Sequence, residues 1–354
     1  MRHKDKVHNL EIADIDVGGD VHRIILAGIN KSPGKSALEI REMIMTEYDD
    51  LRPLLISPPY GQEDMCADIL FASDHPEASY GYVIMESMGY PYYSGSNTIA
   101  TIAALLEYEI LPTDGTEAEL CLEAPGGLVT ARYTATDDGR LESGQVKGDP
   151  AYVISERERT SLNGFGEINY SLVWSGGYFV LVNAQDVGVT LTPDGIPRMK
   201  EIGFALTETL IHEFQYDHPE YGRIDSPKFV HFMGAFEQTG PKIYRGQGAT
   251  FGHPNTVWNC PTGTGTSARM ALMVQQGKME DNASLEYKSA TGNIFTGHGI
   301  GAIQRGDYTA LQTAISARPY VLATTTLHID FDNPLMRPYL KLKEIMAGTT
   351  PSDI

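Results

Sequence analysis

Hydrophobic and polar positions alternate along this chain in blocks that predict strands and amphipathic helices in turn. Residues 21–29, VHRIILAGI, have the length and apolar content of a strand, whereas residues 36–56 repeat apolar side chains at helical spacing and keep an acidic face. Residues 129–148 have the pattern of two strands joined at Asp138-Gly139, a dipeptide typical of hairpin turns. The pattern predicts a mixed α/β protein.

The same alternation continues through the second half of the chain. Residues 171–184 and 228–236 are predicted strands, and residues 198–214 between them repeat apolar positions at helical spacing. Residues 244–255, YRGQGATFGHPN, are rich in glycine, for which a loop is the simplest prediction.

One short pattern occurs twice in the chain. The segment that begins at Ser94, SGSNTIATIAALL, aligns without a gap with TGTGTSARMALMV, which begins at Thr262, at an offset of 168 residues. Both have a hydroxyl residue, glycine, a second hydroxyl residue and a threonine, followed by alanines at matching positions. A repeat of this kind predicts two similar halves, residues 1–138 with 330–354 and residues 139–329, divided near the Asp138-Gly139 turn.

Each copy places a glycine-containing loop directly before an alanine-rich helix. The first N–H groups of a helix have no partner within it, and the helix dipole puts a partial positive charge at the same end. Two such helix starts that face each other would bind a carboxylate. Simple capping by Ser94 and Thr262 is the alternative, because both residue types cap helices in many proteins. The repetition of the whole pattern favours the ligand site.

Composition and charge narrow the class of protein. With 354 residues, 42% of them hydrophobic, the chain is long enough for two domains. A formal charge of −19 disfavours nucleic acid and anionic membrane as partners. The three cysteines, Cys66, Cys121 and Cys260, lack metal-ligand spacing and fit a reducing compartment. No apolar run has the length of a signal peptide core or a membrane span, so we expect a cytoplasmic protein.

Motifs along almost the whole chain resemble those of the proline racemase family. They are, in order, DMCADILFA, YGYVIMESMGY, SGSNTIA, LEAPGGLV, SGGYFVLV, CPTGTGTSARMA, GNIFTGH and IDFDNPL. This family includes hydroxyproline epimerases and trans-3-hydroxyproline dehydratases. The resemblance implies a diaminopimelate-epimerase-like fold, in which two pseudo-symmetric halves each wrap a sheet around a central helix. It also implies that the substrate is held between the two helix N-termini.

The chain departs from the family at its catalytic positions. Family racemases carry a cysteine at the head of each loop, and these positions are Ser94 and Thr262 here. The family's histidine and aspartate ligands of the substrate nitrogen are replaced by Ser96 and Trp258. The resemblance therefore implies Ser94 and Thr262 as catalytic positions. The implied substrate-binding residues are Gly95, Ser96, Asn97, Thr98, Trp258, Gly263, Thr264, Gly265 and Thr266.

Serine and threonine need a neighbouring base before they can act in proton transfer. Neither motif contains histidine or lysine, so the base must come from elsewhere in the fold. Family position makes Asp16, Asp20 and His298 the candidates. Cys260, two residues before Thr262, is either a displaced thiol or a small buried hydrophobe.

These features predict an isomerase or lyase that acts at Cα of a small carboxylate resembling proline or hydroxyproline, by racemisation, epimerisation or dehydration. Threonine at the second loop favours dehydration within the family. The alternative is a catalytically silent carboxylate-binding protein. An ionisable side chain within hydrogen-bond reach of Ser94 or Thr262 would favour the enzyme. No metal or organic cofactor is implied, and a homodimer is the default expectation.

Overall fold

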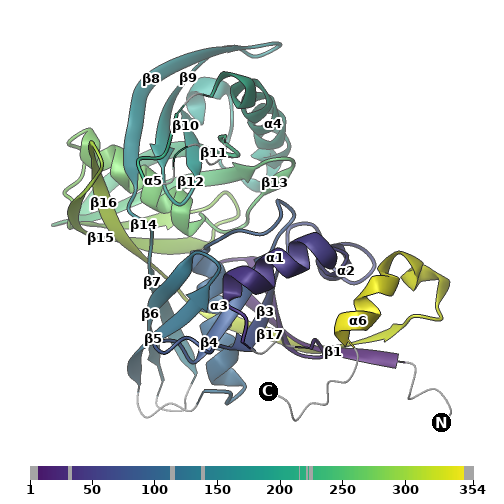
Figure 1. The fold of residues 1–354 in the computed structure, drawn as a ribbon. Coiled ribbons are helices and arrows are strands. Elements are labelled where there is room, and N and C mark those ends of the chain that lie inside the picture. The colour runs from purple at the N-terminus through teal and green to yellow at the C-terminus, as the bar shows by residue number, and fades with distance from the viewer. Residues whose placement is uncertain are drawn as a thin grey trace. The chain divides into compact units, whose positions relative to one another are not determined.

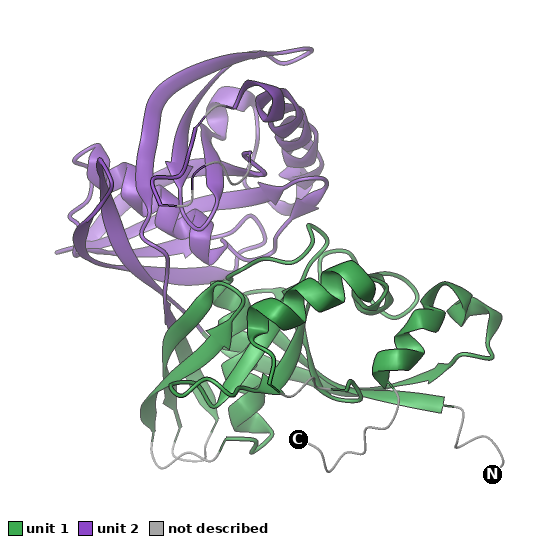
Figure 2. Ribbon diagram, in the orientation of Figure 1, with its two compact units in different colours: residues 1–144, 318–354 green, residues 145–317 purple. Residues whose placement is uncertain are grey.

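The computed structural model describes residues 7–30, 34–111, 116–136, 140–214, 216–220, 222 and 226–346. The chain divides into two compact units, coloured separately in Figure 2: unit 1 comprises residues 1–144 and 318–354, and unit 2 residues 145–317. The predicted boundaries, 138/139 and 329/330, lie six residues before the first division and twelve after the second. The second difference arises because strand Pro319–Asp330 pairs with the first strand of unit 1.

Unit 1 is built on a mixed sheet with strand order β17-β1-β2-β3-β4-β5-β6 (Figure 1). The β2–β3 and β4–β5 pairs are parallel, and the other four pairs are antiparallel. The strands are β1 (Val7–Val17), β2 (Asp20–Ala27), β3 (Cys66–Ala72), β4 (Tyr80–Met85), β5 (Glu117–Ala124), β6 (Gly127–Ala135) and β17 (Pro319–Asp330). The division between the units falls within β7 (Leu141–Lys147).

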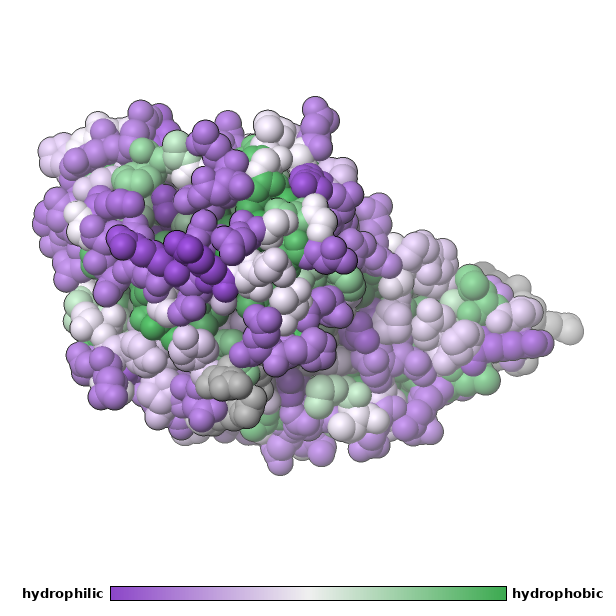
Figure 3. Space-filling model, turned by 90° about the horizontal axis from the view of Figure 1, so that it is seen from above, coloured by the Kyte–Doolittle hydropathy of each residue, from purple (hydrophilic) through white to green (hydrophobic). Residues whose placement is uncertain are grey.

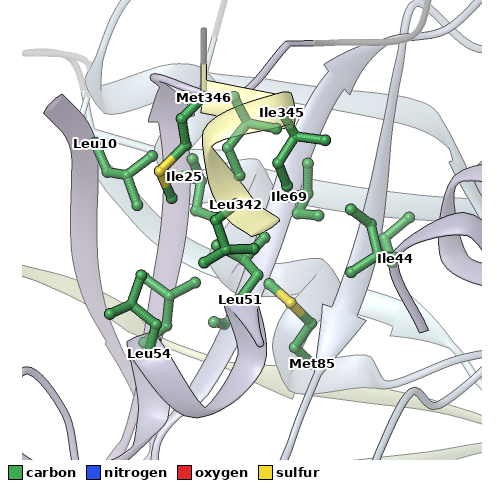
Figure 4. Packing of buried hydrophobic residues seen from close by; sticks show 14 of the residues in the cluster. Leu10, Ile25, Ile44, Leu51, Leu54, Ile69, Met85, Leu342, Ile345 and Met346 are labelled. Carbon is green, nitrogen blue, oxygen red and sulfur yellow. The ribbon is translucent and has the colours of Figure 1, made fainter. Parts of the chain in front are cut away.

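Helices pack on this sheet and bury its apolar side chains. Alternate side chains of β3, at Ala67, Ile69 and Phe71, enter a core with α1 (Ala37–Glu47), α2 (Leu51–Ile56) and the C-terminal η4 (Pro334–Leu342) and α6 (Lys343–Met346). Figure 4 shows Leu342, Ile345 and Met346 within this core. The intervening side chains of β3 belong to the other face of the sheet, on which α3 (Gly95–Glu107) packs.

Unit 2 repeats this plan with its own core residues. Its sheet has the order β8-β9-β10-β11-β12-β14-β15-β16, with β13 added beside β12. The strands are β8 (Tyr152–Leu162), β9 (Gly166–Trp174), β10 (Tyr178–Asn183), β11 (Phe229–Gly240), β12 (Ile243–Gly252), β13 (Thr256–Val257), β14 (Ser284–Lys288), β15 (Ile294–Arg305) and β16 (Tyr308–Ala317). The helices are η2 (Gln185–Val187), η3 (Pro193–Gly195), α4 (Ile196–Glu213) and α5 (Gly263–Gln275). Val180 and Val182 pack on the α4 side, whereas Phe179 and Leu181 pack on the α5 side.

The two units share one topology. The first seven strands of each sheet show the same succession of antiparallel, antiparallel, parallel, antiparallel, parallel and antiparallel pairs. In each unit a helix of 13 residues, α3 or α5, begins at the glycine of the repeated motif. The predicted fold of two pseudo-symmetric α/β halves is therefore confirmed.

The structure confirms most predicted elements and corrects three. Residues 171–184 are not one strand: they contain the end of β9 and the whole of β10, an antiparallel pair with a turn at Gly176, whose φ is +66°. Residues 36–56 form two helices, because the ring of Pro53 cannot lie in the interior of a continuous helix. The predicted loop at 244–255 is wrong, since residues 243–252 form the central strand β12. Its glycines allow a close approach: a Cβ on Gly248 would lie 2.2 Å from the Tyr287 hydroxyl oxygen. The predicted turn at Asp138 and Gly139 lies outside the described residues.

Hydrophilic residues cover most of the face drawn in Figure 3, with smaller hydrophobic areas between them. This agrees with the net charge of −19. In the described part of the chain, no helix is long and apolar enough to cross a membrane.

Candidate active site

The first candidate site lies at the start of α3, where Ser94 is the N-cap. The Ser94 hydroxyl oxygen accepts the backbone N–H of Asn97 at 3.5 Å. The carbonyl oxygen of Ser94 accepts both the N–H of Thr98 at 3.1 Å and the hydroxyl of Thr98 at 2.7 Å. The bond from Asn97 satisfies one of the four N–H groups that a helix start leaves unpaired, and the N–H of Thr98 makes the first ordinary bond of the helix.

The start of α5 repeats the same bonds around Thr262. The Thr262 hydroxyl oxygen accepts the N–H of Gly265 at 3.1 Å. Its carbonyl oxygen accepts the N–H of Thr266 at 3.0 Å and the hydroxyl of Thr266 at 2.8 Å. The sequence repeat is thus a repeat of atomic structure, and Ser94 and Thr262 do serve as helix caps.

Capping leaves fewer donors for a ligand than the sequence predicts. The N–H groups of Asn97, Thr98, Gly265 and Thr266 are already bonded within their own helix starts. The N–H groups that remain in each first turn belong to the residue pairs Gly95–Ser96 and Gly263–Thr264. The carboxylate-binding role of these two pairs, and the clamp between the two helices, stay predictions.

The two N-caps differ in backbone conformation. Ser94 is extended, with φ −154° and ψ 129°, whereas Thr262 has φ 57° and ψ 137°. A positive φ is rare for a β-branched residue and costs on the order of 1–3 kcal/mol. Strain of this kind is concentrated at functional sites in proteins, and it distinguishes Thr262 from an ordinary cap.

This difference predicts unequal effects of glycine and alanine at the two caps. At Ser94, glycine should be about 0.5–1 kcal/mol more stable than alanine, because glycine is the better cap. At Thr262 the difference in unfolding free energy between the glycine and alanine variants should be larger than at Ser94 by about 1–2 kcal/mol, because glycine also relieves the positive φ. Urea unfolding of the four single variants measures both differences. Equal differences at the two positions would show that Thr262 is not strained.

Behind Ser94 lies a buried polar cluster centred on the side chain of Asn97. Its amide nitrogen donates to the Ser94 hydroxyl oxygen at 2.8 Å and to Glu86 Oε1 at 3.1 Å. Its amide oxygen accepts His22 Nδ1–H at 2.9 Å. The Cys66 thiol also donates to Glu86 Oε1, at 3.6 Å. Asn97 and His22 are fully buried, so these contacts fix the orientation of both groups.

Burial shifts the protonation of this cluster. It raises the pKa of the Glu86 carboxyl to about 7, although the hydrogen bonds from Cys66 and Asn97 act in the opposite direction. Burial lowers the pKa of His22 to about 4. The carboxyl oxygens of Asp68 have no hydrogen-bond partner among the described residues, and burial together with the nearby Glu86 raises its pKa well above the ordinary value. Glu86 can therefore gain or lose a proton near neutral pH.

Behind Thr262 a chain of hydrogen bonds runs into the core of unit 2. The Thr262 hydroxyl lies 2.8 Å from that of Thr250, and the Thr250 hydroxyl lies 2.8 Å from His231 Nδ1. His231 Nε2 in turn lies 2.9 Å from the Tyr287 hydroxyl. Burial and the nearby charge of Arg269 lower the pKa of His231 to about 3, so its imidazole is neutral.

The base candidates taken from family position have different surroundings. Asp16 accepts the N–H of Gly19 at 2.6 Å and so closes the β1–β2 turn. His298 is bonded to two serine hydroxyls, those of Ser284 and Ser316. Among the described residues, neither side chain is hydrogen-bonded to Ser94 or Thr262. Asp20 is buried, and its charge contributes to the raised pKa of Glu86, which places it beside the Ser94 cluster.

Two further predicted residues precede Thr262 in the sequence. Cys260 is buried, and its sulfur accepts the N–H of Thr262 at 3.2 Å. Trp258 is 9% exposed. Its ring is tilted relative to that of Phe229, with the ring centroids 6.1 Å apart. Its role as a substrate-binding residue stays a prediction.

Sequence reasoning missed Glu86, His22, Thr250 and His231 as members of these clusters. A signal was present, because each is a polar residue within or directly after a run of buried residues in a strand. Such residues need partners in the core and often mark functional sites. The registers that bring them to the helix starts come from strand pairing across long sequence separations, which periodicity does not reveal.

An ionisable side chain within hydrogen-bond reach of Ser94 or Thr262 is the feature expected of an enzyme. The structure has such side chains, but each lies behind an intervening residue. In the described residues, the hydrogen-bond partners of the Ser94 and Thr262 hydroxyls are uncharged groups. The ionisable groups stand further back: Glu86 behind Asn97, and His231 behind Thr250. In the same residues, no group of three or more His, Cys, Asp or Glu side chains could hold a metal ion.

The fold is a duplicated α/β architecture with a matching helix start in each unit. The sequence model of the proline racemase family matches residues 12–340. The chain therefore belongs to the proline racemase family.

Individual relatives are similar over nearly the full length. A protein of Chromohalobacter salexigens is 36% identical over 327 residues, which cover 92% of this chain and 90% of the relative. The human trans-3-hydroxy-L-proline dehydratase is 28% identical over 340 residues, covering 94% of both chains. The crystal structure of a hydroxyproline epimerase from Agrobacterium vitis with bound trans-4-OH-L-proline is similar with a TM-score of 0.82, at 25% identity and 95% coverage of both chains.

Proposed function

We propose that this protein is an isomerase or lyase that acts at Cα of a small carboxylate related to proline or hydroxyproline. Ser94 and Thr262 are the side chains that act on the two faces of Cα. The N–H groups of Gly95 and Ser96, and of Gly263 and Thr264, bind the substrate carboxylate. Trp258 contributes an apolar wall.

Two kinds of support come from the comparisons. The family contains enzymes of this type, and a relative named as a dehydratase and one named as an epimerase cover nearly the whole chain. The epimerase structure holds a hydroxyproline. A small cyclic amino acid is therefore the first substrate class to test.

The observation that most directly supports this proposal is the position of the Glu86 carboxyl behind Ser94. Asn97 donates to both groups through one amide nitrogen, so the Ser94 hydroxyl and the Glu86 oxygen lie on the order of 5 Å apart. That distance can be bridged by a single water. A carboxyl with a pKa of about 7 is suited to accept a proton from Cα–H chemistry near neutral pH. It supplies the base that the two motifs themselves lack.

Proton NMR in deuterium oxide tests the proposal. The protein is incubated with L-proline, with cis and trans isomers of 3- and 4-hydroxyproline, and with non-cyclic amino and hydroxy acids as controls. We expect the Cα–H signal of at least one cyclic substrate to disappear, and the product distinguishes inversion from dehydration. The Ser94→Ala variant should reduce this exchange on the order of 10²-fold.

A persistent Cα–H signal with every substrate would contradict catalysis. If the same carboxylates then raised the melting temperature, the silent carboxylate-binding protein would replace our proposal, because ligand binding to the folded state stabilises it. Neither exchange nor thermal stabilisation would contradict both functions.

A further inference from the structure

The hydrogen-bonded chain behind Thr262 is longer than capping requires. Thr262 Oγ1 needs only the N–H of Gly265 to act as a cap, yet it also contacts Thr250, and the contacts continue to His231 and Tyr287. All three consecutive distances are between 2.8 and 2.9 Å. Each linking group can both donate and accept a hydrogen bond, as a proton relay requires.

Two glycines, Gly265 and Gly248, pack directly against this chain of hydrogen bonds. A Cβ on Gly265 would lie 2.4 Å from Thr262 Oγ1, 2.6 Å from Thr250 Oγ1 and 2.9 Å from His231 Nδ1. A Cβ on Gly248 would lie 2.2 Å from the Tyr287 oxygen and 2.8 Å from His231 Nε2. No other residue type fits at either position without displacing a member of the chain. The close packing of these glycines thus leaves the polar side chains from Thr262 to Tyr287 in direct contact with one another.

A buried cation stands beside the inner end of the chain. Arg269 is 6% exposed, its Nη1 contacts the sulfur of Met233 at 2.8 Å, and its Nε has no hydrogen-bond partner among the described residues. In the part of the chain that the structure describes, Arg269 contacts Met233 and the ring of Phe236 and makes no ion pair with a carboxylate. Together with burial, its charge opposes protonation of His231; at Tyr287 it acts against burial, which raises the pKa of the phenol to about 12. His231 is therefore neutral, so one of its ring nitrogens donates while the other accepts, and the hydrogen-bond chain can pass a proton from Tyr287 towards Thr262.

On these grounds we infer that Tyr287, His231 and Thr250 form a proton-donating relay through which Thr262 protonates Cα. This inference rests on the proposed function and assigns the direction of proton transfer. Ser94 and Glu86 remove the proton from one face of Cα, and Thr262 donates a proton to the other face. The resulting reaction is inversion at Cα. Dehydration, which a threonine at this position favours within the family, does not need such a relay.

The transfer balances in protons and electrons. The Tyr287 O–H proton moves to His231 Nε2, while the Nδ1 proton moves to Thr250 and the Thr250 hydroxyl proton to Thr262 Oγ1. The Thr262 hydroxyl proton forms the new C–H bond with the electron pair of the Cα carbanion. The net change is one broken O–H bond and a phenolate at Tyr287, beside Arg269. Thr262 is the catalytic residue, and the three residues behind it are positioning residues.

The resting direction of the hydrogen bonds can be measured without turnover. The relay requires a neutral His231 that carries its proton on Nδ1 and accepts the Tyr287 hydroxyl at Nε2. We expect ¹⁵N NMR of histidine-labelled protein at pH 7 to show this tautomer, with the signal assigned by its loss in His231→Gln. A proton on Nε2, or a charged imidazolium, would overturn the inference.

The kinetic test uses Tyr287→Phe, which keeps the ring and removes the terminal donor. In deuterium oxide the variant should still exchange Cα–H, because the Ser94 side is intact, but it should return deuterium to the same face. We expect inversion to fall on the order of 10²-fold relative to exchange, with KM within about twofold of wild type. Tyr244→Phe is the matched control, since it also loses one phenol hydrogen bond in unit 2, to Glu280 at 2.8 Å.

The outcomes separate the inference from the proposed function. An unchanged ratio of inversion to exchange in Tyr287→Phe would overturn the relay and leave Cα chemistry intact. Dehydration as the only wild-type reaction would do the same. Absence of exchange in the wild-type protein would contradict the proposed function itself. An equal fall of exchange and inversion would show that Tyr287 acts only through stability, and this would also overturn the relay.

Discussion

Replacing Gly265 by alanine is expected to abolish turnover and to lower the free energy of unfolding by about 1–3 kcal/mol. The new methyl group would lie within 2.9 Å of three polar atoms, on Thr262, Thr250 and His231. These atoms cannot all move away without breaking the contacts that join them. The measurements are inversion at Cα, which requires Thr262 and which exchange on the Ser94 face alone does not measure, and urea unfolding.

Gly263→Ala is the matched control for stability. Its Cβ would first meet Ile315 at 3.6 Å, an ordinary contact, so the free energy of unfolding should stay within about 1 kcal/mol of wild type. The repeated motif does not distinguish these two glycines, whereas the structure does. Wild-type stability and turnover in Gly265→Ala would contradict the close packing around Thr262.

Glu86→Gln should lower kcat on the order of 10²-fold and stabilise the protein at alkaline pH. The loss of activity is expected because the variant removes the proposed base. The folded protein holds the Glu86 proton up to a pKa of about 7, whereas the unfolded chain releases it near 4.5. The unfolded state therefore binds fewer protons between these values, and Glu86 lowers stability as pH rises through this range.

The stabilisation should consequently depend on pH. At pH 8 Glu86→Gln should raise the free energy of unfolding by up to about 3 kcal/mol, and at pH 4 it should have little effect. Urea unfolding at the two pH values measures the difference. Glu119→Gln is the control, since Glu119 is exposed and its ion pair with Arg132 contributes little at the surface. A gain of equal size at both pH values would show that ionisation of Glu86 is not its cause.

The sequence predicted the architecture well because the fold repeats itself. The pattern at Ser94 and Thr262 identified both helix starts and, with the family resemblance, the duplicated topology. It could not reveal that Thr262 has a positive φ while Ser94 is extended. Both residues cap a helix in the same way, so their local sequence carries no signal of the difference.

The groups behind the two caps were beyond sequence reasoning for a different reason. In unit 1 the polar group next to the cap comes from the helix itself, through Asn97. In unit 2 the equivalent position is Gly265, and the polar groups come from strands, through Thr250 and His231. The two halves thus place polar groups next to the cap residue from different elements, a helix in unit 1 and strands in unit 2. Only the strand registers show which residues these are.

The division of the chain also has a consequence for how the protein is made. Unit 2 is continuous, from residue 145 to residue 317, and can fold as soon as its last strand has left the ribosome. Unit 1 must wait, because β1 pairs with β17 at the far end of the chain, and Leu342 and Met346 complete its core. The N-terminal strands are therefore synthesised first and finished last. Until then β1 is an unpaired edge, and a chain that stops before residue 319 leaves it exposed to aggregation.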